Sequence, residues 1–127
     1  MSVQFKMIPK KNSLVSPPEV NYYPCAVSKG EVNLDNLAKI ISSRCTISRP
    51  DCYGVIMALS QVIGEALSDG KIVRLESLGT FQLNLLGTPA ATADAIGKSN
   101  IKGAKINYKP SKDLKSKVNK ITYKRMR

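Results

Sequence analysis

The feature that most constrains the fold is a wide apolar stripe between residues 52 and 67. Apolar residues recur there at spacings of three and four, which predicts a long helix with one apolar side: Cys52, Val55, Ile56, Leu59, Ile63, Ala66 and Leu67. Met57 and Val62 widen this stripe, so the helix must be covered on more than one side. A chain of 127 residues with only 6% aromatic residues offers little to cover it. We therefore expect an obligate dimer.

Helix boundary signals frame this stripe and place a second helix before it. Ser48 and Asp51 form an S-x-x-D start with Pro50 in the first turn, and Asp69-Gly70 ends the helix. A shorter helix is predicted to begin after Asn33, with one apolar stripe made of Leu34, Leu37, Ala38, Ile41 and Cys45. A tight connection at Thr46-Ile47 would join the two as a helical hairpin.

Strand patterns follow the hairpin. Residues 71–75 lead to a turn at 76–79, and Phe81, Leu83 and Leu85 then alternate with polar residues. Residues 87–100 show no periodicity. Alternation returns with Ala104, Ile106 and Tyr108 inward and Lys105, Asn107 and Lys109 outward, and Ser111 can cap a last helix with the apolar stripe Leu114, Val118 and Ile121.

The first thirty residues form an extension. Val3, Phe5 and Met7 alternate as in a strand that Pro9 stops, and residues 10–19 are expected to be a loop. Residues 22–27 predict a second short strand, which Pro24 confines to a sheet edge. We therefore expect an N-terminal strand-containing extension over 1–30 and an α+β domain over 31–127.

Charge is distributed unevenly along the chain. Residues 98–127 carry eleven basic side chains and one acidic one, Asp113, whereas residues 31–97 carry five basic and seven acidic side chains. This asymmetry indicates either a polyanionic partner or a basic solubilising tail.

Composition argues against an enzyme. The chain has no histidine, which excludes Ser/His/Asp and Cys/His constellations and every His-containing metal site. Its three cysteines include no C-x-x-C pair, so we expect neither a disulfide framework nor a zinc site, and Cys45 and Cys52 are expected to be buried thiols. No run approaches the about 18 apolar residues of a membrane span, and the N-terminus lacks a signal peptide. We expect no catalytic residue, cofactor, metal, small-molecule substrate or membrane partner, and a cytoplasmic location.

Three segments in this order resemble a known family, namely Asp69-Gly70-Lys71-Ile72-Val73, Leu75-Glu76-Ser77-Leu78-Gly79-Thr80-Phe81, and the stretch from Tyr108-Lys109-Pro110-Ser111 to Val118. Together they are similar to the bacterial histone-like HU and integration host factor proteins, over roughly residues 31 to 120. The N-terminal extension resembles that of an HU-related branch in Bacteroidetes-type bacteria, in which extra strands precede the HU-like unit.

The resemblance implies an intertwined dimer, here expected to be a homodimer, with a helical hairpin, a three-stranded antiparallel sheet, a protruding β-arm at about 86–103 and a short C-terminal helix. It implies a nucleoid-associated protein that embraces double-stranded DNA, on the minor-groove side, without chemistry of its own. The DNA-contacting residues that it implies are Arg49, Lys98, Lys102, Lys105, Lys109, Lys112 and Lys115.

The arm departs from the family pattern. That pattern has several arginines and an Asn-Pro pair whose proline wedges between base pairs. Residues 88–103 contain no arginine and no Asn-Pro pair; Pro89 comes too early for a tip, and Ile96 is a candidate apolar substitute only. We therefore expect weaker DNA bending than family members produce, and an arm that is mobile without DNA over residues 88–100.

Two other functions stay open on the sequence. The same fold could serve as a protein-interaction module whose strand-forming extension adds to a neighbouring sheet edge. Alternatively, the basic surface could bind RNA, although the five tyrosines are scattered and form no evident stacking platform.

Overall fold

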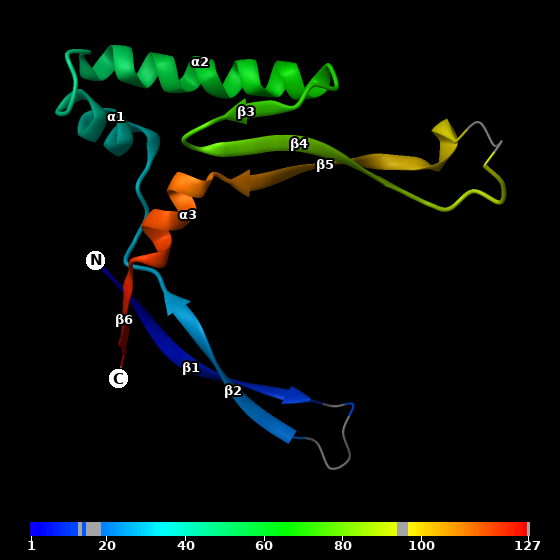
Figure 1. The fold of residues 1–127 in the computed structure, drawn as a ribbon, viewed down its shortest axis with the longest axis horizontal. Helices are drawn as coiled ribbons and strands as arrows, with labels where there is room; N and C mark the ends of the chain where they lie inside the picture. The colour runs from blue at the N-terminus through cyan, green and yellow to red at the C-terminus, as the bar shows by residue number, and fades with distance from the viewer. Residues whose placement is uncertain (13, 15–18, 94–96, 127) are drawn as a thin grey trace. The chain divides into compact units, whose positions relative to one another are not determined.

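The computed structural model describes residues 1–12, 14, 19–93 and 97–126 of the chain (Figure 1). The chain divides into two compact units. We call residues Asn33–Ser116 the helix–sheet unit, and residues Met1–Val32 together with Lys117–Arg127 the terminal unit. Each unit contains one three-stranded sheet.

The predicted helical hairpin is confirmed. Helix α1 spans Leu34–Ser42 and begins with a capping box in which Asn33 and Asn36 bond reciprocally. Helix α2 spans Arg49–Ser68 and is capped by Ser48, whose hydroxyl accepts a hydrogen bond from the Asp51 N–H at 3.4 Å. Gly70, at φ +82°, lies directly after the cap residue of α2 and ends the helix as predicted.

The two cysteines of the hairpin differ. The prediction that Cys45 is a buried residue of α1 is wrong, because α1 stops at Ser42 and Cys45 is exposed. The hydroxyls of Ser42 and Ser43 donate to carbonyls of the last turn, an alternative to continuing the helix. Cys52 is buried as predicted, and this burial, with a smaller contribution from Cys45, raises the pKa of its thiol.

The sheet of the helix–sheet unit is antiparallel, in the order β3 (Val73–Leu75), β4 (Gly79–Gly87) and β5 (Ile101–Pro110). Its register confirms the predicted alternation, since Phe81 pairs with Tyr108, Leu83 with Ile106 and Leu85 with Ala104. Paired residues share a face of a sheet. The rings of Phe81 and Tyr108 lie 5.0 Å apart on this apolar face, and α2 contacts both β3 and β4.

The turn before β4 depends on a glycine. Gly79 has φ +144°, and a Cβ at this position would lie 2.2 Å from the Lys109 carbonyl oxygen. The Tyr108 hydroxyl donates to the Leu78 carbonyl at 2.8 Å, and the Ser111 hydroxyl donates to the Ser77 carbonyl at 2.8 Å. Residues 75–81 and the stretch that begins at Tyr108 are two of the segments that carried the resemblance. These hydrogen bonds join them directly.

Much of the apolar surface of the helix–sheet unit remains exposed. Ala38, Cys52 and Leu67 are the buried hydrophobic residues of the described chain. By contrast, Val55 and Val62 of α2 are 60% and 58% exposed, and Leu85 and Ile106 of the sheet are 67% and 60% exposed. A single chain thus leaves its wide α2 stripe only partly covered, as the sequence predicted.

The distal end of the β4–β5 hairpin contains structure that the sequence did not predict. A 3-10 turn, η1, spans Lys98–Asn100, in a stretch expected to lack regular structure. The Asn100 side chain donates to the Pro89 carbonyl at 3.2 Å and to the Thr88 hydroxyl at 3.3 Å, and the Thr88 N–H donates to the Asn100 carbonyl at 2.8 Å. Short polar side chains can form such turns without any hydrophobic periodicity. Ile96 lies outside the described residues.

The sheet of the terminal unit has the order β2–β1–β6. Strand β1 (Ser2–Asn12) pairs antiparallel with β2 (Glu19–Val27) and parallel with β6 (Thr122–Arg125). Pro24 therefore does lie on an edge strand, as predicted. The prediction that Pro9 ends the first strand, with residues 10–19 as a loop, is wrong, because pairing continues to Asn12 and Glu19.

The position of Pro9 explains why the strand tolerates it. The carbonyl of Phe5 faces β6, since it accepts from the Met126 N–H at 2.8 Å. In a β-strand the N–H and C=O groups of residues four apart point to the same side, so the backbone nitrogen of Pro9 points to the same side as the Phe5 carbonyl. Strand β6 pairs only as far as Phe5, so the missing N–H of Pro9 faces an open edge and costs no ladder hydrogen bond.

The C-terminal end of the chain was predicted only in part. Helix α3 spans Lys112–Asn119, and the Ser111 hydroxyl accepts from the Leu114 N–H at 3.1 Å, as a cap should. The placement of Ile121 on this helix is wrong, since α3 ends at Asn119 and β6 follows. The boundary between the two units falls within α3.

Candidate nucleic-acid interface

The polar face of the β3–β4–β5 sheet carries a row of basic side chains. Arg74 pairs with Thr80, and Thr80 pairs with Lys109 on its other side, so these residues of three strands lie in line. On the same face, Asn107 of β5 pairs with Gln82 of β4. Two residues further from Lys109, Lys105 pairs with Asn84. We call the resulting surface the basic sheet face; it contains no acidic residue and consists of Arg74, Thr80, Gln82, Asn84, Lys105, Asn107 and Lys109.

The charges of this face are not neutralised by ion pairs. Within the described part of the chain the ion pairs are Arg49–Asp35 and Lys71–Asp69. Arg74, Lys105 and Lys109 belong to neither and are exposed. The three cations of the basic sheet face are thus free of ion pairs with other described residues and accessible to a polyanion.

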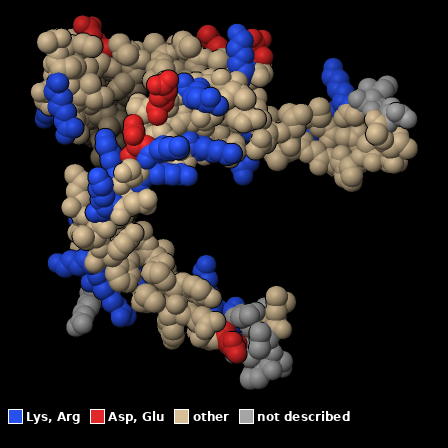
Figure 2. All heavy atoms as spheres, in the orientation of Figure 1, with Lys and Arg blue, Asp and Glu red and all other residues tan. Residues whose placement is uncertain are grey.

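Helix α3 continues this surface from the end of β5. Because Ser111 caps the helix, Lys112 and Lys115 lie in its first turn, directly after Lys109 and Pro110. A shallow hollow of about 420 Å³ connects the two elements and is lined by Arg74, Lys109 and Lys112, with Glu76 and Asp113 beside them. Figure 2 shows basic side chains gathered where β5 leads into α3, with acidic ones next to them. The hollow therefore offers three cations, partly offset by two carboxylates.

Arg49 lies elsewhere, at the first position of α2. Its guanidinium Nε donates to Asp35 Oδ1 at 3.2 Å and its Nη2 donates to Asp35 Oδ2, which ties α2 to α1. Both side chains are about half exposed, at 48% and 55%. Arg49 can reach solvent, but a phosphate would have to compete with Asp35 for it.

The other two predicted residues lie near the distal end of the hairpin. Lys98 begins η1, and Lys102 is the extra residue of a β-bulge, since Leu86 pairs with Gly103 and Gly87 with Ile101. A bulge redirects the side chains around it. The structure thus brings together Lys105, Lys109, Lys112 and Lys115 of the seven predicted residues, and places Arg49, Lys98 and Lys102 apart from them.

Arg74 is the member of this surface that sequence reasoning missed. It sits on a strand of only three residues, and nothing in its neighbourhood distinguishes it from a solvated arginine. Its position in line with Lys109 follows from pairing across β4, which the sequence does not show directly.

Two other kinds of site are absent from the described residues. In residues 1–12, 14, 19–93 and 97–126, no group of three or more Cys, Asp or Glu side chains could hold a metal ion. Among the same residues, no helix combines the length and apolar content needed to cross a membrane.

A comparison with models of protein families identifies the family of this chain. Residues 1–125 match the model of the HU-HIG family, described as an HU domain fused to a winged helix-turn-helix, Ig or glycine-rich motif. The chain belongs to this family. The match covers both units of this HU-HIG protein, so the terminal unit is part of the family pattern. A search of curated proteins finds no match.

Two solved structures share the fold of this HU-HIG protein. A proposed DNA-binding protein from Bacteroides vulgatus superimposes with a TM-score of 0.70 at 12% identity, over 99% of this chain and 50% of the other. Anabaena HU, solved with DNA, superimposes with a TM-score of 0.54 at 20% identity, over 69% of this chain and 98% of the other. The chain thus spans half the length of the Bacteroides protein. The HU match also confirms the expected HU-like α+β fold class.

Proposed function

We propose that this HU-HIG protein is a non-enzymatic architectural protein of the bacterial nucleoid that binds double-stranded DNA. The observation that carries the proposal is the row of basic side chains without ion-pair partners on the basic sheet face, continued by Lys112 and Lys115. This row occurs on a fold shared with a protein solved in complex with DNA. Lys98 and Lys102 would extend the contact along the hairpin, and Arg49 would add one from α2.

Binding should depend little on DNA sequence. Lysine and arginine neutralise phosphates, which carry no base information. The amides and hydroxyl between them, on Gln82, Asn84, Asn107 and Thr80, also donate readily to phosphate oxygens. The surface is therefore suited to a DNA backbone, on the minor-groove side if the hairpin embraces the duplex as in HU.

The functional protein should be a homodimer. The exposed apolar residues of α2, with Leu85 and Ile106 of the sheet, need a cover that one chain does not supply. A second copy provides the same apolar surface and doubles the number of cations that face the duplex.

A salt titration of DNA binding tests the proposal. Six to eight phosphate contacts per dimer give a slope of log affinity against log salt of roughly −5 to −7. Replacing Lys112 and Lys115 together with Ala should flatten that slope by about two to four units, on unrelated sequences alike. The matched control, Lys39→Ala with Lys71→Ala, removes the same charge from α1 and from the Asp69 ion pair and should leave the slope within one unit.

Three outcomes would contradict the proposal. An unchanged slope in the Lys112 and Lys115 variant would mean that α3 is not the DNA surface and would favour a protein-interaction module. If the control variant changed the slope equally, the effect would come from the net charge of the protein and not from the positions of Lys112 and Lys115. Tighter binding to RNA than to duplex DNA would favour the RNA function instead.

A further inference from the structure

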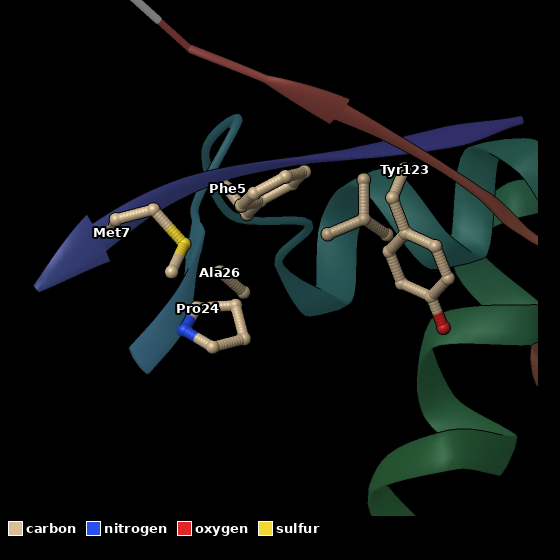
Figure 3. Close-up of a pocket in the computed structure, with 6 residues that line it drawn as sticks. Phe5, Met7, Pro24, Ala26 and Tyr123 are labelled. Carbon is tan, nitrogen blue, oxygen red and sulfur yellow. The ribbon is translucent and has the colours of Figure 1, made fainter. Parts of the chain in front are cut away.

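The sheet of the terminal unit has two chemically different faces. One face is mostly apolar and surrounds an open hollow lined by Val3, Phe5, Met7, Pro24, Ala26 and Tyr123 (Figure 3). It also carries two cations, Lys11 and Arg125, which pair with Val20 and Phe5. The opposite face contains the residues between these positions. It carries Lys6 and Lys10 on β1 and Lys124 on β6, because Lys124 pairs with Gln4. Ile8, Tyr23, Cys25 and Val27 lie on the same face among these lysines. All three lysines are exposed, and none forms an ion pair within the described residues.

We propose that this second face, the lysine face of the terminal unit, binds the phosphate backbone of double-stranded DNA as an additional contact surface. The inference rests on the proposed function, since it adds a site to a protein whose other surface is proposed to bind the same polymer. It gives the N-terminal extension a DNA-binding role, whereas the sequence suggested strands that could add to a neighbouring sheet edge.

The lysines extend far enough along the sheet to meet several phosphates. Residues along a strand rise about 3.4 Å each, so Lys6 and Lys10 lie about 14 Å apart and Lys124 extends the row to about 20 Å. A DNA strand also advances about 3.4 Å per nucleotide, so the row covers about six steps. Glu19, at the hairpin end of β2, is the acidic residue of this face among the described ones.

The aromatic content of the face favours a duplex over a single strand. Binding of single strands relies on exposed aromatic rings on which bases stack. Tyr23 is the aromatic residue of this face, and the Lys10 ammonium lies 5.4 Å from its ring centroid. Tyr22 and Tyr123 belong to the apolar face. The lysine face therefore offers three cations along about 20 Å and one aromatic ring, which the Lys10 ammonium already covers.

The test compares two triple variants that lose the same charge from the same unit. The first removes the lysine face: Lys6→Ala, Lys10→Ala and Lys124→Ala. The second removes cations of the other face and of the loop after β2: Lys11→Ala, Lys29→Ala and Arg125→Ala. Each full-length protein is titrated with salt against duplex DNA, single-stranded DNA and RNA, beside wild type and the Lys112 and Lys115 variant. Circular dichroism melting confirms that each variant is folded.

The lysine-face variant should flatten the slope on duplex DNA by about two to three units per dimer, and the control by less than one. A slope that stays at the wild-type value, or equal changes in both triples, would overturn the inference. If the Lys112 and Lys115 variant still flattens the slope in that case, the proposed function stands and only this inference fails. A larger loss on single-stranded DNA or RNA than on duplex would overturn the assignment to duplex. No binding by wild type would overturn both.

Discussion

The two sheets of the molecule are alike in plan and differ in how the chain builds them. Each has three strands, with an apolar face and a basic one. In the helix–sheet unit the strands are consecutive in sequence and antiparallel, and α2 contacts the sheet. In the terminal unit the third strand comes from the other end of the chain and runs parallel to the first, pairing Ser2 with Thr122. Local patterns therefore reveal the three strands of the first sheet and only two of the three strands of the second.

The two units should differ most in stability when the exposed apolar stripe of α2 in the helix–sheet unit is disrupted. Leu59→Asp places a carboxylate on the α2 stripe, which a dimer buries. An uncompensated buried charge costs about 3–5 kcal/mol, so the helix–sheet unit should lose its fold and its dimer together. Circular dichroism and light scattering measure both.

Gln61→Asp adds the same charge two residues away, at an exposed polar position of α2, and should leave folding unchanged. A Leu59→Asp protein that stays folded as a monomer at micromolar concentration would contradict the dimer.

The turn before β4 gives the next largest effect. In Gly79→Ala the new methyl would meet the Lys109 carbonyl at 2.2 Å in a backbone conformation that only glycine adopts readily. We expect a loss of about 2–4 kcal/mol in the free energy of unfolding, measured by chemical denaturation. Gly103→Ala, also in this sheet, has open space around its Cβ position and should cost less than about 1 kcal/mol. Similar losses for both would show that the turn does not hold the sheet.

A proline directly after β6 should affect the terminal unit alone. Met126→Pro removes the N–H that donates to the Phe5 carbonyl at 2.8 Å, whereas Met126→Ala keeps it. Losing one such bond lowers local stability by about 1 kcal/mol. Hydrogen exchange of β1 and β6 should therefore quicken severalfold in the proline variant, with the amides of β4 and β5 unchanged. Equal exchange in the proline and alanine variants would mean that β6 does not depend on this pairing.

The smallest expected effect concerns DNA shape. Residues 88–103 contain no arginine and no Asn-Pro pair, and the carbonyl of Pro89 is bound by Asn100 near the end of the hairpin. Without a wedging side chain the protein should bend a duplex less than HU proteins with the Asn-Pro pair. Energy transfer between dyes at the duplex ends measures the bend. A sharply bent duplex would mean that another side chain of the protein wedges between base pairs.

An element could be predicted from the sequence when the interactions that form it join residues close together in the chain. Caps such as Asn33, Ser48 and Ser111 act within three residues, and strand alternation within ten, so both helices of the hairpin and β3 to β5 could be predicted. Strand β6 is four residues long and gains its partner 120 residues away, so no local pattern distinguishes it from a frayed helix end.

The candidate site shows the same limit. Lys105 and Lys109 were predicted from alternation on a single strand, and Lys112 and Lys115 follow a cap and a family-like segment. Arg74 joins them only through a register that passes across β4. The lysine face likewise needs Lys124 to be paired with Gln4. The sequence also led us to group Arg49 with the DNA-contacting lysines. The ion pair between Arg49 and Asp35 could be seen only in the structure.

A lysine footprint tests the central claim most directly. The protein is acylated with an amine-reactive ester with and without a duplex of about three helical turns, and each lysine is quantified by mass spectrometry. Bound DNA should protect Lys105, Lys109, Lys112 and Lys115 severalfold, because phosphates occupy their ammonium groups. Lys39 and Lys71 should react as in the free protein. Unchanged reactivity at the four lysines while DNA is bound would contradict the assignment of the basic sheet face and α3 as the DNA surface.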